Sequence, residues 1–309
     1  MKKKASKYLR LIGIFVFIAI LYEINIKRAC LLIQNINIEI YCFALLLVIP
    51  VFIISAFRWF YFLKFQNINY PFLSALLVNQ TSQFIAFVSP GRIGEMIKVW
   101  YLMKDTKVSF IKGSVSVFIP RFMDASILLI CCISFFSMIS IEKRLILVAG
   151  IVICSLFLMF FFKIAAKDKR MIIANDDNPV IKNIKKLFHE TCLIIRFKLI
   201  LFLLITLFLY LFFFYFCYYL AESIGLNLDF SVVLFVVSAG NILSFLPFSI
   251  AGIGTRDASY IFILSQLGKS YEEAIIFSNL VFLSFYLFGG TIGFISYMIK
   301  PIEIGKIHK

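Results

Sequence analysis

Long uninterrupted apolar runs constrain the fold of this chain more than any other feature of its sequence. Several runs reach the roughly 20 residues that an α-helix needs to cross about 30 Å of hydrocarbon. Of the 309 residues, 62% are hydrophobic and 15% are charged, whereas soluble domains are about half apolar and about a quarter charged. The sequence therefore predicts an all-α, polytopic helical membrane protein with a single membrane domain over residues 1–309.

Six of the apolar runs are predicted to be full transmembrane spans. They are Leu11–Ile24, Ile40–Leu63, Gly113–Met138, Leu145–Ala165, Leu199–Ala221 and Ala274–Ile299. The lysine-rich start of the chain resembles a signal peptide, but no small-residue cleavage site follows it. The first run is therefore expected to be retained as a span.

Two further apolar regions, Pro71–Met103 and Phe230–Leu267, are interrupted by proline and glycine. The arms after the breaks, Ile93–Met103 and Ala258–Leu267, rise only about 16 Å as helices, which is half of a bilayer core. Such arms favour re-entrant helical hairpins, whose irregular backbone must be buried in protein or line a wet cavity. The residues expected to shape or hinge the two breaks are Pro90, Gly91, Gly94, Pro247, Gly252 and Gly254.

The distribution of charge predicts how the chain is oriented in the membrane. Six spans from a cytoplasmic N-terminus return the C-terminus to the cytoplasm, together with the first hairpin region and the basic loop 163–198. The second hairpin region carries more acidic than basic residues and falls outside. Basic segments between spans usually stay in the cytoplasm. This explains the net charge of +15 without a nucleic-acid partner, and it favours a plasma-membrane protein with both termini cytoplasmic.

The order of span, hairpin and span occurs twice, with the two hairpins entering from opposite faces. The two halves, about residues 40–138 and 199–299, are joined by the basic loop 163–198. They share a proline, a glycine four or five residues later and an acidic residue beside an apolar helix. We predict an inverted-topology repeat, which in many transporters places the substrate site between the halves near the bilayer midplane.

Charged residues follow the first break at intervals of three. Arg92, Glu95 and Lys98 would share one face if this run is helical. The helix N-terminus after Pro90 and Gly91 would add an anion-binding end. We interpret the segment as a site for a phosphate or carboxylate, with Glu95 orienting Arg92. The alternative is an ordinary cytoplasmic loop whose charges face water.

Two other charged pairs lie within or beside apolar sequence. Arg121 and Asp124 fall in the third span, where ionisable side chains are costly and usually functional, and their spacing lets them pair with each other. The alternative is a structural ion pair that fixes helix packing. Arg256 and Asp257 follow the second break, and as sequence neighbours they cannot share a helix face, so each is expected to have a different partner. The alternative there is an extracellular turn with surface charges.

Uncharged polar residues within the hairpin arms should face protein or water rather than lipid. Those expected to line a cavity are Asn79, Gln83 and Asn241. The chain has only two histidines, and its seven cysteines are scattered without the spacing of a zinc site. No metal site, cofactor or catalytic group is predicted, and an enzymatic function is not favoured.

Three stretches, PGRIGEMIKVWYL, PRFMDASILL and LPFSIAGIGTRDA, resemble in this order the motifs of one family. It is the lysylphosphatidylglycerol synthase transmembrane-region, or flippase-like, family, and the likeness extends from about Phe57 to Gly293. The resemblance implies a helical membrane fold with re-entrant segments. It also assigns the family's motif positions to Arg92, Glu95, Arg121, Asp124, Arg256 and Asp257.

The sequence departs from the family patterns at three positions. Lys98 stands where Arg is common, Pro120 stands where a Glu often precedes Arg121, and Asp257 stands where Glu is usual. The loss of that Glu leaves Asp124 as the nearest expected partner of Arg121. No soluble domain follows the last span, so the aminoacyl-transfer domain of bifunctional relatives is expected to be absent.

These features predict a flippase-like integral membrane protein that binds an anionic lipid and moves it between leaflets. The candidate lipids are a modified phospholipid and a polyprenyl-phosphate glycolipid. Two alternatives stay open, namely a membrane-embedded transferase acting on a lipid head group and an accessory subunit of a glycosyltransferase. The expected partners are the bilayer, the anionic lipid, and either a second copy of the chain or a lipid-modifying enzyme.

Overall fold

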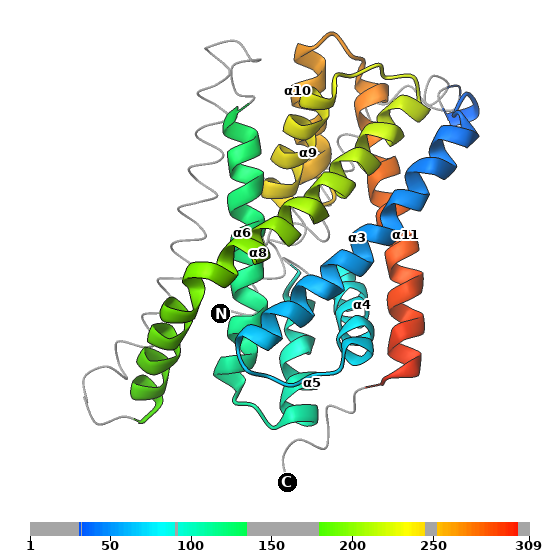
Figure 1. The fold of residues 1–309 in the computed structure, drawn as a ribbon. Helices are drawn as coiled ribbons and strands as arrows, with labels where there is room; N and C mark the ends of the chain where they lie inside the picture. Colours follow the sequence, from blue (N-terminus) through cyan, green and yellow to red (C-terminus); the bar gives the residue numbers. More distant parts are fainter. Residues whose placement is uncertain (1–30, 32, 90–91, 135–178, 245–251, 302–309) are drawn as a thin grey trace, which may run out of the picture.

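The computed structural model describes residues 31, 33–89, 92–134, 179–244 and 252–301, and every regular element within them is a helix. The elements (Figure 1) are α3 (Ile38–Phe65), α4 (Phe72–Val88), the 3-10 turn η1 (Ile93–Met96), α5 (Ile97–Thr106), α6 (Phe110–Ser134), α8 (Pro179–Ser223), α9 (Phe230–Ser244), α10 (Thr255–Gln266) and α11 (Tyr271–Ile299). The predicted spans Leu11–Ile24 and Leu145–Ala165 lie outside the described residues, as do Pro90, Gly91 and Pro247.

Four of the described helices, α3, α6, α8 and α11, are long and apolar enough to cross a membrane. The 28 residues of α3, for example, rise about 42 Å, which exceeds the hydrocarbon thickness of about 30 Å. These helices confirm the helical character of the second, third, fifth and sixth predicted spans. The later part of the basic loop 163–198 is helical, because α8 begins at Pro179 and continues into the span.

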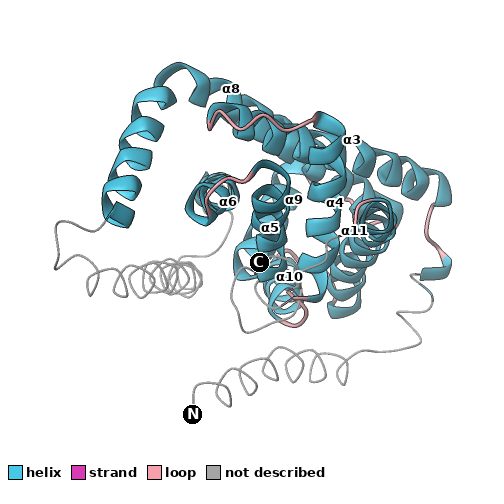
Figure 2. Cartoon of the chain, turned by 90° about the horizontal axis from the view of Figure 1, so that it is seen from below, coloured by secondary structure: helices cyan, strands magenta, loops and turns pink. Residues whose placement is uncertain are grey.

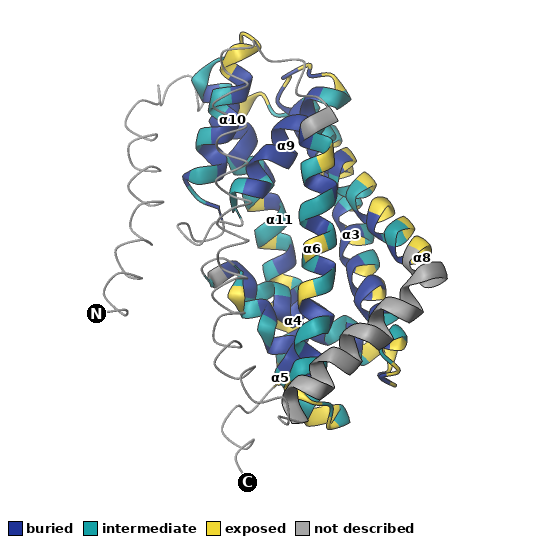
Figure 3. Ribbon diagram, turned by 90° about the vertical axis from the view of Figure 1, so that its left-hand side faces the viewer, coloured by how far each residue is buried: buried dark blue, intermediate teal, exposed yellow. Residues whose placement is uncertain are grey.

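Each interrupted region folds as helices that meet at its break. α4 packs against η1 and α5, and α9 packs against α10. The two assemblies lie toward opposite ends of the bundle (Figures 1 and 3). α5 has 10 residues and α10 has 12, so they rise only about 15–18 Å and are too short to cross a bilayer.

The helices pack in a defined set of pairs. α3 runs beside α8 and α4 beside α11 (Figure 2), and α6 packs on α9. The contact between α4 and α11 is close at Gly293, where a Cβ atom would lie 2.6 Å from the carbonyl oxygen of Gln80. Gly289, one turn earlier, faces Phe52 and Phe87. Small residues one turn apart allow membrane helices to approach each other in this way.

The buried apolar side chains form two clusters. The larger is built mainly from α8, α9, α10 and α11, and the smaller joins the end of α3 to α4 and α5. A cavity lies where the two clusters meet, lined by Trp59 from the smaller and by Phe52 and Tyr260 from the larger. The fold therefore leaves a space in its interior between the two hairpins.

A polar cluster ties the first hairpin to the end of α11. Nζ of Lys300 lies 2.6 Å from Oδ2 of Asp105, and the Tyr70 hydroxyl donates to the same oxygen at 2.6 Å. Lys300 also donates to the Tyr70 oxygen at 3.1 Å. Burial, and after it the hydrogen bond to Asp105, raises the pKa of Tyr70 above its usual value. The cluster fixes the loop before α4, the end of α5 and the end of α11 to one another.

Candidate functional site

The interior cavity brings five basic and two acidic side chains into one wall. Its lining comes from all the described α-helices and from η1. The cavity leaves about 120 Å³ for the centres of water-sized molecules, several times the roughly 10–15 Å³ that one water needs. Its polar and charged lining residues are Ser55, Arg58, Asn79, Gln83, Arg92, Glu95, Lys98, Ser116, Arg121, Asp124, Tyr210, Asn241, Ser244, Arg256, Tyr260 and Tyr286.

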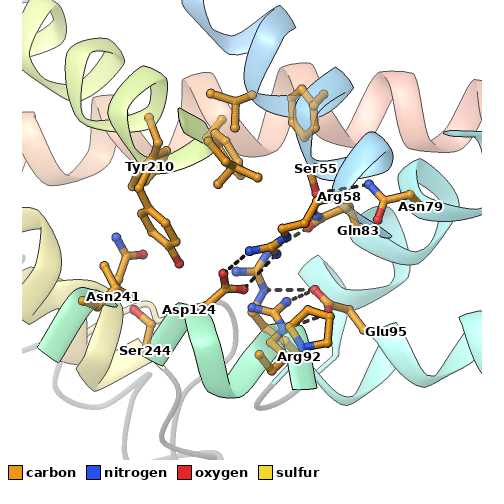
Figure 4. A pocket seen from close by; sticks show the side chains of 18 of the residues that line it. Ser55, Arg58, Asn79, Gln83, Arg92, Glu95, Asp124, Tyr210, Asn241 and Ser244 are labelled. Carbon is orange, nitrogen blue, oxygen red and sulfur yellow. Dashed lines mark hydrogen bonds and ion pairs between the residues drawn. The ribbon is translucent and has the colours of Figure 1, made fainter. Parts of the chain in front are cut away.

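Arg58 and Asp124 form a two-pronged ion pair near the centre of this wall (Figure 4). Both terminal nitrogens of Arg58 donate to Asp124, with Nη2 3.1 Å from Oδ2. The two residues are 8% and 5% exposed, so the charges depend on each other rather than on solvent. Arg58 was not selected from the sequence, although it is the one charged residue within the predicted span Ile40–Leu63, which is a recognised sign of function.

Arg121 pairs with Glu95, so the predicted pairing of Arg121 with Asp124 is wrong. Nε of Arg121 lies 2.7 Å from Oε2 of Glu95, and Nη2 contacts the other oxygen. Residues three apart can meet on a helix surface, but here each finds an opposite charge on a different element. Arg121 reaches η1, whereas Asp124 reaches Arg58 on α3. The two ion pairs thus connect α3, η1 and α6 around the cavity.

The backbone at the first break differs from the predicted helix. Arg92 has a φ of 56°, in the left-handed region, and it precedes a 3-10 turn rather than an α-helix. Arg92, Glu95 and Lys98 therefore do not share one α-helical face. The close approach of η1 to α4 explains this, because a Cβ atom on Gly94 would lie 2.5 Å from the carbonyl oxygen of Ile85. The chain must turn tightly past α4 before the regular helix begins.

The contacts of Arg92 also differ from those predicted. Its Nη2 donates to Oε1 of Gln83 at 2.9 Å, whereas its Nε is 4.0 Å from Glu95. A neutral amide, more than Glu95, therefore orients this arginine. The N–H of Gly94 donates to the Ser89 hydroxyl at 2.7 Å, so this group is already occupied at the predicted anion-binding end.

Arg256 and Asp257 pair with each other, and the prediction of separate partners is wrong. Nη2 of Arg256 lies 2.9 Å from Oδ1 of Asp257, and both side chains bond to the hydroxyl of Ser278. The cause is local, because Oδ2 of Asp257 accepts the N–H of Gly254 at 2.8 Å. This bond turns the carboxylate back across the start of α10. Only Arg256 lines the cavity, since Asp257 is fully buried behind it.

The glycines of the second break adopt backbone conformations that favour glycine. Gly252 and Gly254 have φ values of +81° and +83°, where other residues are strained. A Cβ atom on Gly252 would also lie 2.2 Å from the hydroxyl oxygen of Ser244, a residue of the cavity wall. These glycines let the chain enter α10 with Arg256 directed at the cavity.

The three amide side chains predicted to line a cavity all lie in its wall. Asn79 and Gln83 on α4 point their NH₂ groups toward the Ser55 hydroxyl on α3, at 3.2 and 3.5 Å. Asn241 donates to the carbonyl of Val237 at 3.0 Å within α9. In Figure 4, Asn241 and Tyr210 lie on the other side of Asp124 from the first hairpin. The wall therefore combines polar groups from both halves of the chain.

Residues 9–293 match the family described as the lysylphosphatidylglycerol synthase TM region. The chain belongs to this family. The match includes all three motifs and both hairpin regions, and it agrees with the resemblance found in the sequence. A comparison with curated proteins finds no match.

In this member of the lysylphosphatidylglycerol synthase TM region family, the three motifs converge on the cavity. Their charged side chains in its wall are Arg92, Glu95 and Lys98 from the first, Arg121 and Asp124 from the second, and Arg256 from the third. Within the described part of the chain, no group of three or more His, Cys, Asp or Glu residues is placed to hold a metal ion. The chemistry that this wall offers is the binding of an anion by guanidinium and ammonium groups.

Proposed function

We propose that this membrane protein binds the anionic head group of a lipid in the cavity and moves the lipid between leaflets. The observation that carries the proposal is that Arg92 and Arg256, from the breaks of two different hairpins, line the same cavity. Arginine forks match phosphate oxygens and bind them through charge-assisted hydrogen bonds. The family name refers to a phospholipid, lysylphosphatidylglycerol, which supports a lipid as the ligand.

The ion pairs lower the cost of burying three arginines in the site when no lipid is bound. Each carboxylate lowers the cost of burying its arginine among apolar helices. The pairs are Arg58 with Asp124, Arg121 with Glu95, and Arg256 with Asp257. A guanidinium has five N–H donors, so an arriving phosphate accepts hydrogen bonds from donors that the carboxylates do not use. The head group thus enters a site that is already organised.

The packing of the helices supports an inverted repeat. The first half runs α3, α4, α5 and α6, and the second runs α8, α9, α10 and α11. α4 packs on α11 and α9 on α6, α5 packs on α6 and α10 on α11, and α3 packs on α8. If α3 is exchanged with α8, α4 with α9, α5 with α10 and α6 with α11, this set of contacts is unchanged. Such repeats let a central site open to one side and then the other as the halves rock.

The charges at the two ends of the bundle support an orientation in the plasma membrane. Lys64, Lys104 and Lys107 are exposed at the end that holds the first hairpin, whereas Glu39 and Asp229 are exposed at the other end. Basic segments beside spans usually stay in the cytoplasm. The first hairpin and the C-terminal end of α11 therefore face the cytoplasm, and the second hairpin faces outside.

Reconstitution of the full chain into vesicles tests the proposal. A trace of acyl-labelled fluorescent anionic phospholipid is added, and dithionite reports the rate at which the label changes leaflet. We expect the wild type to accelerate exchange, and Arg92→Ala and Arg256→Ala to slow it at least about tenfold, since each removes charged hydrogen bonds. Lys104→Ala, which removes an exposed charge outside the cavity, is the matched control.

Equal exchange by all four proteins, with equal lipid retention in native mass spectrometry, would refute the assignment of the site. Mass analysis of the vesicle lipids separates the other functions. A new lipid product would identify a head-group transferase. Neither exchange nor product, together with a co-purifying glycosyltransferase, would identify an accessory subunit.

A further inference from the structure

The cavity contains more basic groups than its carboxylates can balance. Asp124 is engaged by Arg58, Glu95 by Arg121, and the buried Asp257 by Arg256. Among the described residues, Lys98 of the wall has no carboxylate partner, and Arg92 lies 4.0 Å from Glu95, whose carboxylate is already engaged by Arg121. The described site therefore has two basic groups in excess of its carboxylates.

Of these two residues, Lys98 gives the stronger evidence for an anionic ligand. It is only 7% exposed, and it forms no hydrogen bond or ion pair with any residue that the structure describes. Its Nζ lies over the ring of Trp59, 5.2 Å from the ring centre, and it lines the cavity. A buried ammonium without a partner is costly, so the group is placed to receive an anion from the cavity.

Arg92 lies in the same wall and is only partly satisfied. Its hydrogen bond goes to the neutral amide of Gln83, and the nearby Glu95 is already engaged by Arg121. Its Nε is buried without a hydrogen-bond partner in the described structure. The guanidinium face lies over Phe87, 5.8 Å from the ring centre. The arginine thus retains donors for a ligand on its cavity side.

From this imbalance we infer that the head group carries two negative charges, as a terminal phosphate or a diphosphate does, rather than the single charge of a phosphodiester. The inference rests on the proposed function and narrows its substrate class. A phosphomonoester carries about −1.5 to −2 charges near pH 7, which matches the two basic groups in excess of the carboxylates. A phosphodiester would leave one of them uncompensated.

Lipid binding in nanodiscs tests the charge of the ligand. The full chain is placed in neutral phosphatidylcholine and titrated with phosphatidic acid and phosphatidylglycerol of the same acyl chains. We expect phosphatidic acid to bind at least about tenfold more tightly, because it makes one more charge-assisted contact.

Variants of Lys98 connect the preference to this residue. We expect Lys98→Met to bring the two affinities to within about threefold, and Lys98→Arg to restore the preference because it keeps the charge. Arg92→Gln should also narrow the ratio, whereas Lys104→Met at an exposed position should not. Polyprenyl phosphate and inorganic phosphate are then added as competitors. Competition by polyprenyl phosphate alone indicates a lipid-linked phosphate, whereas equal competition by inorganic phosphate, which has no apolar tail, indicates a site for free phosphate.

Equal binding of the two phospholipids by the wild type would overturn the inference, whether or not any variant folds. A preference that Lys98→Met and Arg92→Gln both leave intact would also overturn it. Failure of the proposed function gives a different result. If the protein prefers phosphatidic acid but does not accelerate leaflet exchange, the charge of the head group is established and transport is refuted. If Arg256→Ala leaves the binding of both lipids unchanged, the assignment of the binding site to this cavity is refuted.

Discussion

Replacing Asp124 by Asn removes the charge that balances Arg58 while keeping the shape of the side chain. The two residues share a two-pronged contact and are at most 8% exposed. Opposite charges about 4 Å apart attract by about 4 kcal/mol at the effective dielectric constant of about 20 that suits proteins. Breaking one side of a buried ion pair typically costs about 3–5 kcal/mol, because a buried charge is left uncompensated. We expect Asp124→Asn to fall at the lower end, since the Asn side chain keeps a carbonyl oxygen that can accept a hydrogen bond from Arg58.

The assay is the free energy of unfolding in mixed micelles of a mild detergent and dodecyl sulfate. The chain has two tryptophans, and Trp59 lies in the cavity wall, so its fluorescence reports on this region. The double variant Arg58→Met with Asp124→Leu should recover most of the loss, because apolar pairs can replace buried ion pairs. Glu39→Gln, at an exposed position, is the control for loss of a carboxylate. A loss below about 1 kcal/mol for Asp124→Asn, or a double variant less stable than Asp124→Asn alone, would refute the reasoning.

Two further predictions concern helix packing and pH. Gly293→Ala should cost about 1–3 kcal/mol, because its Cβ would meet the Gln80 carbonyl oxygen, whereas Gly290→Ala, with nothing within 4 Å, should be neutral or slightly stabilising. Equal unfolding free energies for the two variants would contradict the close packing. The raised pKa of Tyr70 favours its neutral form, so its contribution is present below about pH 10 and is lost above it. Unfolding titrations should show a steeper loss of stability above about pH 10 for the wild type than for Tyr70→Phe, and parallel curves would count against the Asp105 contact.

The hydrophobic spans and both breaks could be predicted from sequence because they depend on local properties. Hydrocarbon thickness fixes the length of an apolar run, and proline or glycine marks a break wherever it stands. The cost of placing a charge among apolar residues is also visible without a partner. This is why Arg92, Arg121 and Arg256 could be selected before the fold was known, and why all three line the cavity.

The pairing of these charges was decided only by the tertiary structure. Which carboxylate an arginine meets depends on which helices pack together, and Arg121 reaches Glu95 only because η1 lies beside α6. Arg58 pairs with Asp124 only because α3 lies close to that residue of α6. Sequence spacing describes neighbours on one helix, whereas the free energy of a buried charge is set by its nearest opposite charge in space. The sequence thus determined that charges must meet inside the membrane domain, and the packing determined which ones do.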